Sequence, residues 1–137
     1  MPRGPFMRTP IIYLASPYTH ADPAVRQARF DAACRAAAAL IRQGMTIFSP
    51  IAHTHAITQC GLPVDWQFWE PHDRRFLELC DELIVLMLDG WKESIGVRAE
   101  IDIALASGKS VSLLDPPPRV DNEGVDCVEA QQEGSEA

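Results

Sequence analysis

The apolar run at residues 83–88 constrains the fold of this chain more than any other sequence feature. It reads Leu-Ile-Val-Leu-Met-Leu, with no polar residue inside it, and it is too short for an ordinary helix. A short run that is apolar at every position fits a strand whose two faces are both covered, and such strands belong to parallel sheets flanked by helices. The run therefore predicts an α/β protein.

The rest of the chain supplies strands and helices in alternation. Short apolar runs at residues 11–15, 45–49 and 110–114 predict three further strands. Helix-capping signals at Asp22-Pro23 and at Ser94 precede helical spacing over residues 23–43 and 95–107. Another helix is expected over residues 65–80, with a break near Pro71 because proline lacks the amide donor. Residues 51–64 show no dependable period, so we expect a loop with at most one helical turn.

This alternation predicts right-handed βαβ units in a doubly wound, mainly parallel open sheet of the Rossmann or flavodoxin type, with three α/β/α layers. One domain over residues 10–115 holds all of these elements. Residues 116–137 form an acidic tail that lacks an apolar period, and we expect it to be mobile. Ligands bind such sheets at the carboxyl ends of the strands, which directs attention to residues 16–20, 50–55 and 89–94.

Composition narrows the class of partner. The formal net charge of −7 argues against binding a nucleic-acid polymer, because lysine and arginine must neutralise its phosphates. No apolar stretch is long enough for a membrane helix, and the first residues do not resemble a secretory signal, so we expect a cytoplasmic protein without a membrane partner. The four cysteines form no CxxC pair, which argues against a zinc or redox motif. A small molecule is the expected partner, with no cofactor.

The segment 89–100 carries the sharpest chemical signal, because it leads from the carboxyl end of a strand into a helix. Backbone amides at the start of that helix, together with the Ser94 hydroxyl, are suited to hold a phosphate or carboxylate. Glu100 shares a helical face with Gly96 and Ala104, whose small side chains are expected to leave space for a substrate. On the residues alone, Glu100 is either reactive or an ordinary solvated helix glutamate.

Histidines and aromatic residues follow the second strand. His53 and His55 alternate on what is expected to be extended backbone, so they should share a side and contact substrate. His72 is a conceivable partner for them as a metal ligand, but nothing in the spacing fixes such a set, and no metal site is predicted. Trp66, Phe68 and Trp69 are interpreted as core or subunit-interface residues, with stacking of one ring on a base as the alternative.

Three places in the chain resemble the nucleoside 2-deoxyribosyltransferase-like superfamily, which includes the 2′-deoxynucleoside 5′-phosphate N-hydrolases. Tyr13-Leu-Ala-Ser16-Pro17 looks like the opening strand and substrate loop of that superfamily, and Asp73 resembles its carboxylate before the third strand. The spacing Ser94-x-Gly96-x-x-x-Glu100 is similar to its nucleophile helix. The chain looks still more like an uncharacterised bacterial branch, a domain of unknown function, which implies the fold and leaves the substrate open.

The resemblance implies a set of roles for these residues. Glu100 would attack the anomeric carbon of a nucleoside or nucleotide, Asp73 would protonate the departing base, and Tyr13 would position the nucleophile. Ser16 and Ser94 would contact the sugar or a 5′-phosphate. The other residues expected to bind substrate are Pro17, His53, His55, Asp89 and Gly96, and Asp89, at the end of its strand, is a candidate for a ribose hydroxyl. The resemblance also implies a homo-oligomer. Asp73 and Asp89 have ordinary readings as helix-start and turn acids, and Tyr13 has one as a core residue. A nucleotide-binding or sensing module without turnover, or a purely structural partner protein, is the alternative to an enzyme.

Overall fold

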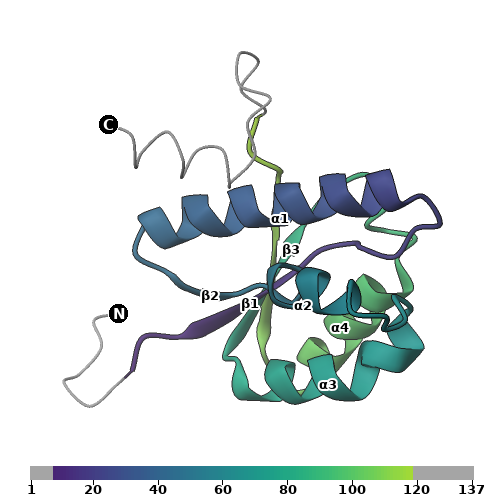
Figure 1. The fold of residues 1–137 in the computed structure, drawn as a ribbon. Coiled ribbons are helices and arrows are strands. Elements are labelled where there is room, and N and C mark those ends of the chain that lie inside the picture. The colour runs from purple at the N-terminus through teal and green to yellow at the C-terminus, as the bar shows by residue number, and fades with distance from the viewer. Residues whose placement is uncertain (1–7, 119–137) are drawn as a thin grey trace.

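The computed structural model describes residues 8–118, which form one parallel sheet and four helices (Figure 1). The strands are β1 (Ile11–Ala15), β2 (Thr46–Phe48), β3 (Glu82–Leu86) and β4 (Ser110–Leu114), in the spatial order β2-β1-β3-β4. The helices are α1 (Pro23–Arg42), α2 (Pro50–Thr58), α3 (Trp66–Leu79) and α4 (Ile95–Ala106). The predicted fold class, a doubly wound α/β/α sheet, is confirmed.

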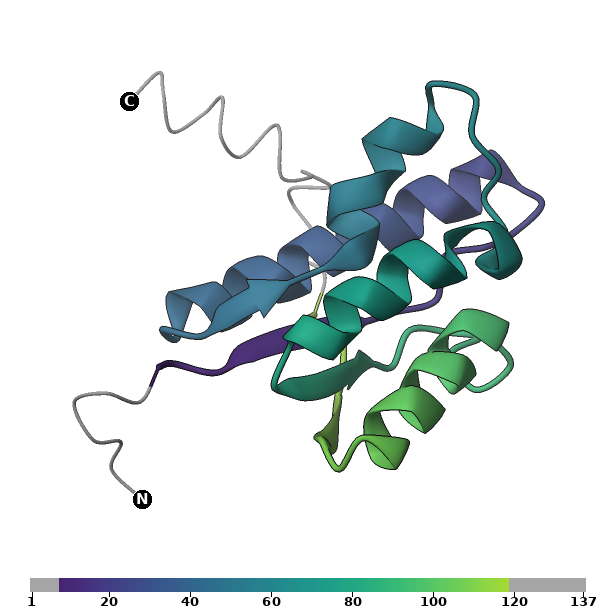
Figure 2. The same ribbon diagram turned by 90° about the horizontal axis from the view of Figure 1, so that it is seen from below.

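The two faces of the sheet are covered by different helices, as the two ribbon views show (Figures 1 and 2). On one face, Leu14 and Leu86 pack with Ala36 and Leu40 of α1. On the other face, the side chains of alternate strand residues join residues of α3 and α4 in a second buried cluster, which contains Tyr13, Ala15, Leu77, Leu83, Val85, Val97 and Ala104. The central strands are therefore buried on both sides, which is why residues 83–88 read as an unbroken apolar run.

Side-chain caps fix where the helices begin. Asp22 accepts a hydrogen bond from the amide of Ala24, with Pro23 at the first helical position of α1. Ser94 accepts one from the amide of Val97 at 3.2 Å and starts α4. Both helices start where the sequence predicts, because a cap and its helix are local and need no tertiary information.

The prediction of a loop over residues 51–64 is wrong for its first part, since residues 50–58 form α2. Ser49 accepts a hydrogen bond from the amide of Ala52, and Pro50 occupies the first helical position. This is the same signal as Asp22-Pro23, but its place directly after an apolar run makes it look like the end of a strand. The helix packs on α1 and β1, where Ile51 meets Tyr18 and Ala33.

The predicted break at Pro71 is also wrong, because α3 runs without interruption from Trp66 to Leu79. The carbonyl that loses its partner at Pro71 is that of Gln67, near the start of the helix, and Pro71 itself is exposed. An exposed carbonyl can bond to water, so one missing bond does not end the helix. Asp73 consequently lies on the same rigid helix as Trp66.

Two further predictions concern membrane helices and the acidic tail. Within residues 8–118 no helix combines the length and the apolar character that crossing a membrane requires. The predicted mobility of the acidic tail concerns residues 116–137, most of which lie outside the described residues.

Candidate functional site

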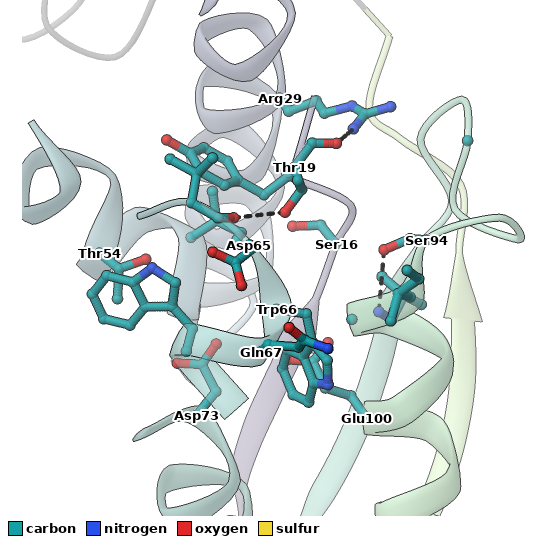
Figure 3. A pocket seen from close by; sticks show the side chains of 18 of the residues that line it. Ser16, Thr19, Arg29, Thr54, Asp65, Trp66, Gln67, Asp73, Ser94 and Glu100 are labelled. Atoms are coloured by element: carbon teal, nitrogen blue, oxygen red, sulfur yellow. Dashed lines mark hydrogen bonds between the residues drawn. The ribbon is translucent and has the colours of Figure 1, made fainter. Parts of the chain in front are cut away.

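A cavity of about 470 Å³ lies at the carboxyl ends of the strands (Figure 3). The chain runs from β1 to β2 on one side of β1 and then returns from β2 to β3 on the other side. The cavity therefore lies at the topological switch point where ligands bind such sheets. All three segments expected at this edge contribute lining residues, and the starts of α3 and α4 complete the wall. The residues labelled in Figure 3 are Ser16, Thr19, Arg29, Thr54, Asp65, Trp66, Gln67, Asp73, Ser94 and Glu100.

Glu100 lines this cavity and is only 4% exposed. Tyr13, from the centre of β1, donates a hydrogen bond from its hydroxyl to Glu100 Oε2 at 2.5 Å. Burial raises the pKa of Glu100 to about 8, the Tyr13 hydrogen bond opposes that rise, and the negative charge of Asp73 adds to it. The ordinary reading of Glu100 as a solvated helix residue is therefore wrong.

Tyr13 lies beneath the carboxylate, fully buried, and is a donor at ordinary pH. Burial and then the charge of Glu100 raise the pKa of Tyr13 well above its usual value, so the phenol keeps its proton. The ring also packs in the core against Phe48, with centroids 5.8 Å apart. Tyr13 is thus both a core residue and a partner of Glu100, and the two readings are not alternatives.

Asp73 lines the cavity from α3 and is 7% exposed. Burial raises its pKa, while a hydrogen bond from His72 and the charges of His72 and His53 act in the opposite direction. Two buried carboxyls on different helices therefore share one cavity. Burial raises the pKa values of both carboxyls, which favours a site that exchanges protons.

Ser16 and Ser94 flank the same space. Ser16 is 5% exposed, and its hydroxyl has no hydrogen-bond partner within residues 8–118. A buried hydroxyl left without a partner loses the hydrogen bonds it would make to water, and a bound ligand can restore one. The Ser94 hydroxyl caps α4 and retains its own hydrogen for a ligand.

The space expected above Glu100 is not arranged as predicted. A Cβ built on Gly96 would lie 3.3 Å from the indole of Trp66, so the space left by the missing side chain is taken up by that ring. Ala104 is fully buried in the core with Leu77 and Leu83. Gly96 still lines the cavity, but its role is to let α3 and α4 approach each other.

The two histidines do not share a side, and neither lines the cavity. They lie two residues apart on α2, where a helix turns successive side chains by about 100° each. His55 faces α1, with its ring nitrogens at 2.7 Å from the Tyr18 hydroxyl and 3.2 Å from Gln27 Oε1. His53 faces the other way and stacks on His72 at a centroid distance of 5.8 Å. The expected extended backbone and shared side of the two histidines are therefore wrong, and their contact with a substrate stays a prediction that the lining of this cavity does not support.

Pro17 and Asp89 also lie off the cavity. Pro17 is fully buried behind Ser16, and the Asp89 side chain is exposed, beside a second cavity between α1 and the end of β3. Within residues 8–118 no group of three or more histidine, cysteine or acidic side chains is arranged to hold a metal ion.

Three further residues that line the cavity are Arg29, Trp66 and Trp69. Arg29 of α1 donates to the carbonyls of Thr19 at 3.0 Å and Asp89 at 3.2 Å, and so joins the loops that follow β1 and β3. Nothing in the sequence distinguishes Arg29 from the other arginines of that helix. Trp66 and Trp69, expected chiefly in the core or an interface, form one wall, with Trp69 fixed by a 2.8 Å bond from its indole to the Pro63 carbonyl.

Residues 10–115 match the model of a protein family described as domain of unknown function DUF1937, a range that includes every strand and helix described above. No curated protein matches the chain. The resemblance to deoxyribosyltransferases stays a prediction that rests on the sequence.

Proposed function

This chain belongs to the DUF1937 family, a domain of unknown function, and we propose its function from the chemistry of the cavity. The proposed function is cleavage of the N-glycosidic bond of a nucleoside or nucleotide, or transfer of its (deoxy)ribosyl group, with Glu100 as the nucleophile. The observation that carries this proposal is the pair of buried carboxyls, Glu100 and Asp73, in one cavity, with the Tyr13 hydroxyl on Glu100. Small-molecule cavities have volumes of about 300–1,000 Å³, and the volume of about 470 Å³ here supports a ligand of the size of a nucleoside.

The first step forms a covalent intermediate. A carboxylate oxygen of Glu100 bonds to the anomeric carbon while the bond from that carbon to the base nitrogen breaks. The electron pair of the broken bond stays on the base, which takes the proton of Asp73. The Tyr13 hydroxyl holds Oε2 in place, so the other oxygen of Glu100 is the one that attacks.

The second step returns both carboxyls to their starting states. Asp73, now ionised, accepts a proton from water as the water oxygen bonds to the anomeric carbon and the ester bond to Glu100 breaks. If a second base replaces water, the same step makes the protein a transferase. In this proposal, the Ser16 hydroxyl, which has no hydrogen-bond partner within residues 8–118, and the Ser94 hydroxyl contact sugar hydroxyls or a 5′-phosphate.

The protonation states set the pH range of the reaction. The reactive form holds one proton on the carboxyl pair, with that proton on Asp73, so base release falls when the pair holds two protons or none. We expect a bell-shaped profile of kcat/KM whose alkaline limb lies near pH 8. The pair loses its last proton at the pKa of Glu100, which burial raises to about 8, and the reactive form with that proton on Asp73 is lost at the same step.

The test is to incubate the purified protein with a panel of nucleosides and 5′-nucleotides and to measure the free base. Glu100→Gln should lower base release by roughly 10⁴-fold or more, because it removes the nucleophile. Asp102→Asn is the matched control, since Asp102 is exposed on the same helix and does not line the cavity. In the wild type, intact mass after a rapid quench should reveal a glycosyl adduct. Base release that survives Glu100→Gln contradicts the assignment of Glu100 as the nucleophile.

One observation favours a second candidate, a nucleotide-binding or sensing module. With a pKa near 8, much of Glu100 is protonated at neutral pH, and a protonated carboxyl donates a hydrogen bond instead of attacking. Tight binding of a nucleotide by calorimetry, with no base released and no adduct across a pH series on both sides of neutrality, would establish this candidate in place of the enzyme.

A further inference from the structure

We propose that His72 is a positioning residue for Asp73: its Nδ1–H holds Oδ1 of Asp73, so that the proton given to the leaving base resides on Oδ2. This inference rests on the proposed function, in which Asp73 is the acid. It concerns a residue that lies outside the cavity lining and that belongs to none of the three matching motifs.

The contact that carries the inference joins neighbouring residues of α3. His72 Nδ1 lies 3.1 Å from Asp73 Oδ1, and this is the one side-chain hydrogen bond of Asp73 within residues 8–118. The Asp73 side chain is 10% exposed, whereas that of His72 is 40% exposed. Asp73 therefore has one oxygen engaged on the side of His72, and it lines the cavity without any other hydrogen bond from a side chain of the described residues.

A carboxylic acid has a single proton, and its place decides whether the acid can act. If that proton were on Oδ1 it would point to the imidazole, and the departing base would receive nothing. A hydrogen bond donated to Oδ1 makes that oxygen the acceptor and leaves the proton on Oδ2. As the proton moves to the base, negative charge develops on Asp73 and the bond from His72 becomes charge-assisted and stronger. The interaction thus favours the transition state over the ground state.

The imidazole is held where this bond requires it. Its ring lies 5.2 Å from Trp69, 5.1 Å from Phe76 and 5.8 Å from His53, measured between ring centroids. His53 comes from α2, so the ring contacts side chains of two helices. The other ionisable groups coupled to Asp73 are His53, Glu100 and Tyr13, and replacing His72 changes none of these residues.

Two variants separate positioning from packing. His72→Asn keeps an N–H donor near the place of Nδ1, whereas His72→Leu keeps apolar bulk and loses the donor. Each is compared with the wild type on a purine deoxynucleoside and on its 7-methylated form, whose base departs without needing a proton. Circular-dichroism melting confirms that both variants fold.

On the unmethylated substrate, we expect His72→Leu to lower kcat by about 10- to 100-fold and His72→Asn to stay within about threefold of the wild type. On the 7-methylated substrate, both should match the wild type. Equal losses on the two substrates, or no loss with His72→Leu, overturn the inference. A wild type that releases base from neither substrate contradicts the proposed function instead.

A second measurement does not depend on turnover. Carbon-13 NMR of the Asp73 carboxyl should show a higher titration midpoint in His72→Leu than in the wild type, because a bond to the ionised form is lost. His72→Asn should restore the midpoint. An unchanged midpoint in His72→Leu means that the bond to Oδ1 does not form in solution, and the inference fails.

Discussion

Tyr13 and Glu100 lie 87 positions apart in the sequence, yet a hydrogen bond joins their side chains in the folded protein. The Tyr13 hydroxyl opposes the rise that burial causes in the pKa of Glu100. Tyr13→Phe should therefore move the titration of Glu100 to higher pH, which carbon-13 NMR of the carboxyl can measure. It should also lower kcat/KM at neutral pH by roughly 10- to 100-fold, because less of Glu100 is ionised and its position is less fixed.

The control for this substitution is Tyr18→Phe. Tyr18 also lines the cavity, but its hydroxyl bonds to His55 and Thr58 on α2 and not to Glu100. It should leave the titration of Glu100 in place. If both variants shift the carboxyl equally, the effect comes from a general change in the cavity and the role assigned to the Tyr13 hydroxyl is wrong.

At the residue scale, the sequence predicts which residues line the cavity better than it predicts which way side chains face. Motifs single out Glu100, Asp73 and Ser16, and the structure brings all three to one cavity. The predicted direction of His55 is wrong because it depends on whether the backbone is extended or helical. Arg29 escapes prediction because its partners are backbone carbonyls, which no sequence pattern records.

At the scale of elements, α3 carries the cavity residue Asp73 and also contains a proline, which is unfavourable inside a helix. Pro71 lies inside it and removes an amide that would otherwise bond to the carbonyl of Gln67. Pro71→Ala should raise the free energy of unfolding by about 1–2 kcal/mol, the gain in helix propensity less the entropy that the unfolded chain regains. Urea unfolding measures this.

Pro23→Ala is the matched control for that change. Pro23 occupies the first helical position of α1, where no amide bond is lost, so alanine there should give no gain. A Pro71→Ala protein that is no more stable than Pro23→Ala would mean that the helix adapts to Pro71 at no cost.

The α2 helix also has a proline at its first position, and Ser49-Pro50 is a helix start that resembles a strand end in the sequence.

At the scale of the whole molecule, the order along the chain of the four strands and of α1, α3 and α4 follows from the sequence, because each of these elements has its own local signal, and α2 is the exception. Parallel strands need helical crossovers, and right-handed crossovers leave few topologies open. What sequence does not predict is which side chains meet across elements. The 3.3 Å approach of Trp66 to the Cβ position of Gly96 joins α3 to α4, and only tertiary packing determines it.

The free energy of unfolding of the whole molecule should depend on pH because the carboxyl of Glu100 is buried. Glu100 has a pKa of about 8 when folded, against an ordinary value of 4.5, so the folded state binds its proton more tightly than the unfolded state does. The contribution of this group is fully present below pH 4.5 and is lost as pH rises toward 8. Burial raises the pKa of Asp73 too, which adds a loss of the same sign.

Replacing Glu100 by glutamine isolates its share of that loss. A glutamine side chain does not titrate, so the difference in unfolding free energy between Glu100→Gln and the wild type should shift in favour of the variant between about pH 5 and about pH 8, by roughly a few kcal/mol. Urea unfolding at both pH values measures the difference, and Asp102→Asn, exposed on the same helix, should show no such shift. A difference that stays constant with pH would mean that Glu100 is hydrated in solution. In that case the carboxyl would lack the raised pKa that defines the alkaline limb of the proposed reaction.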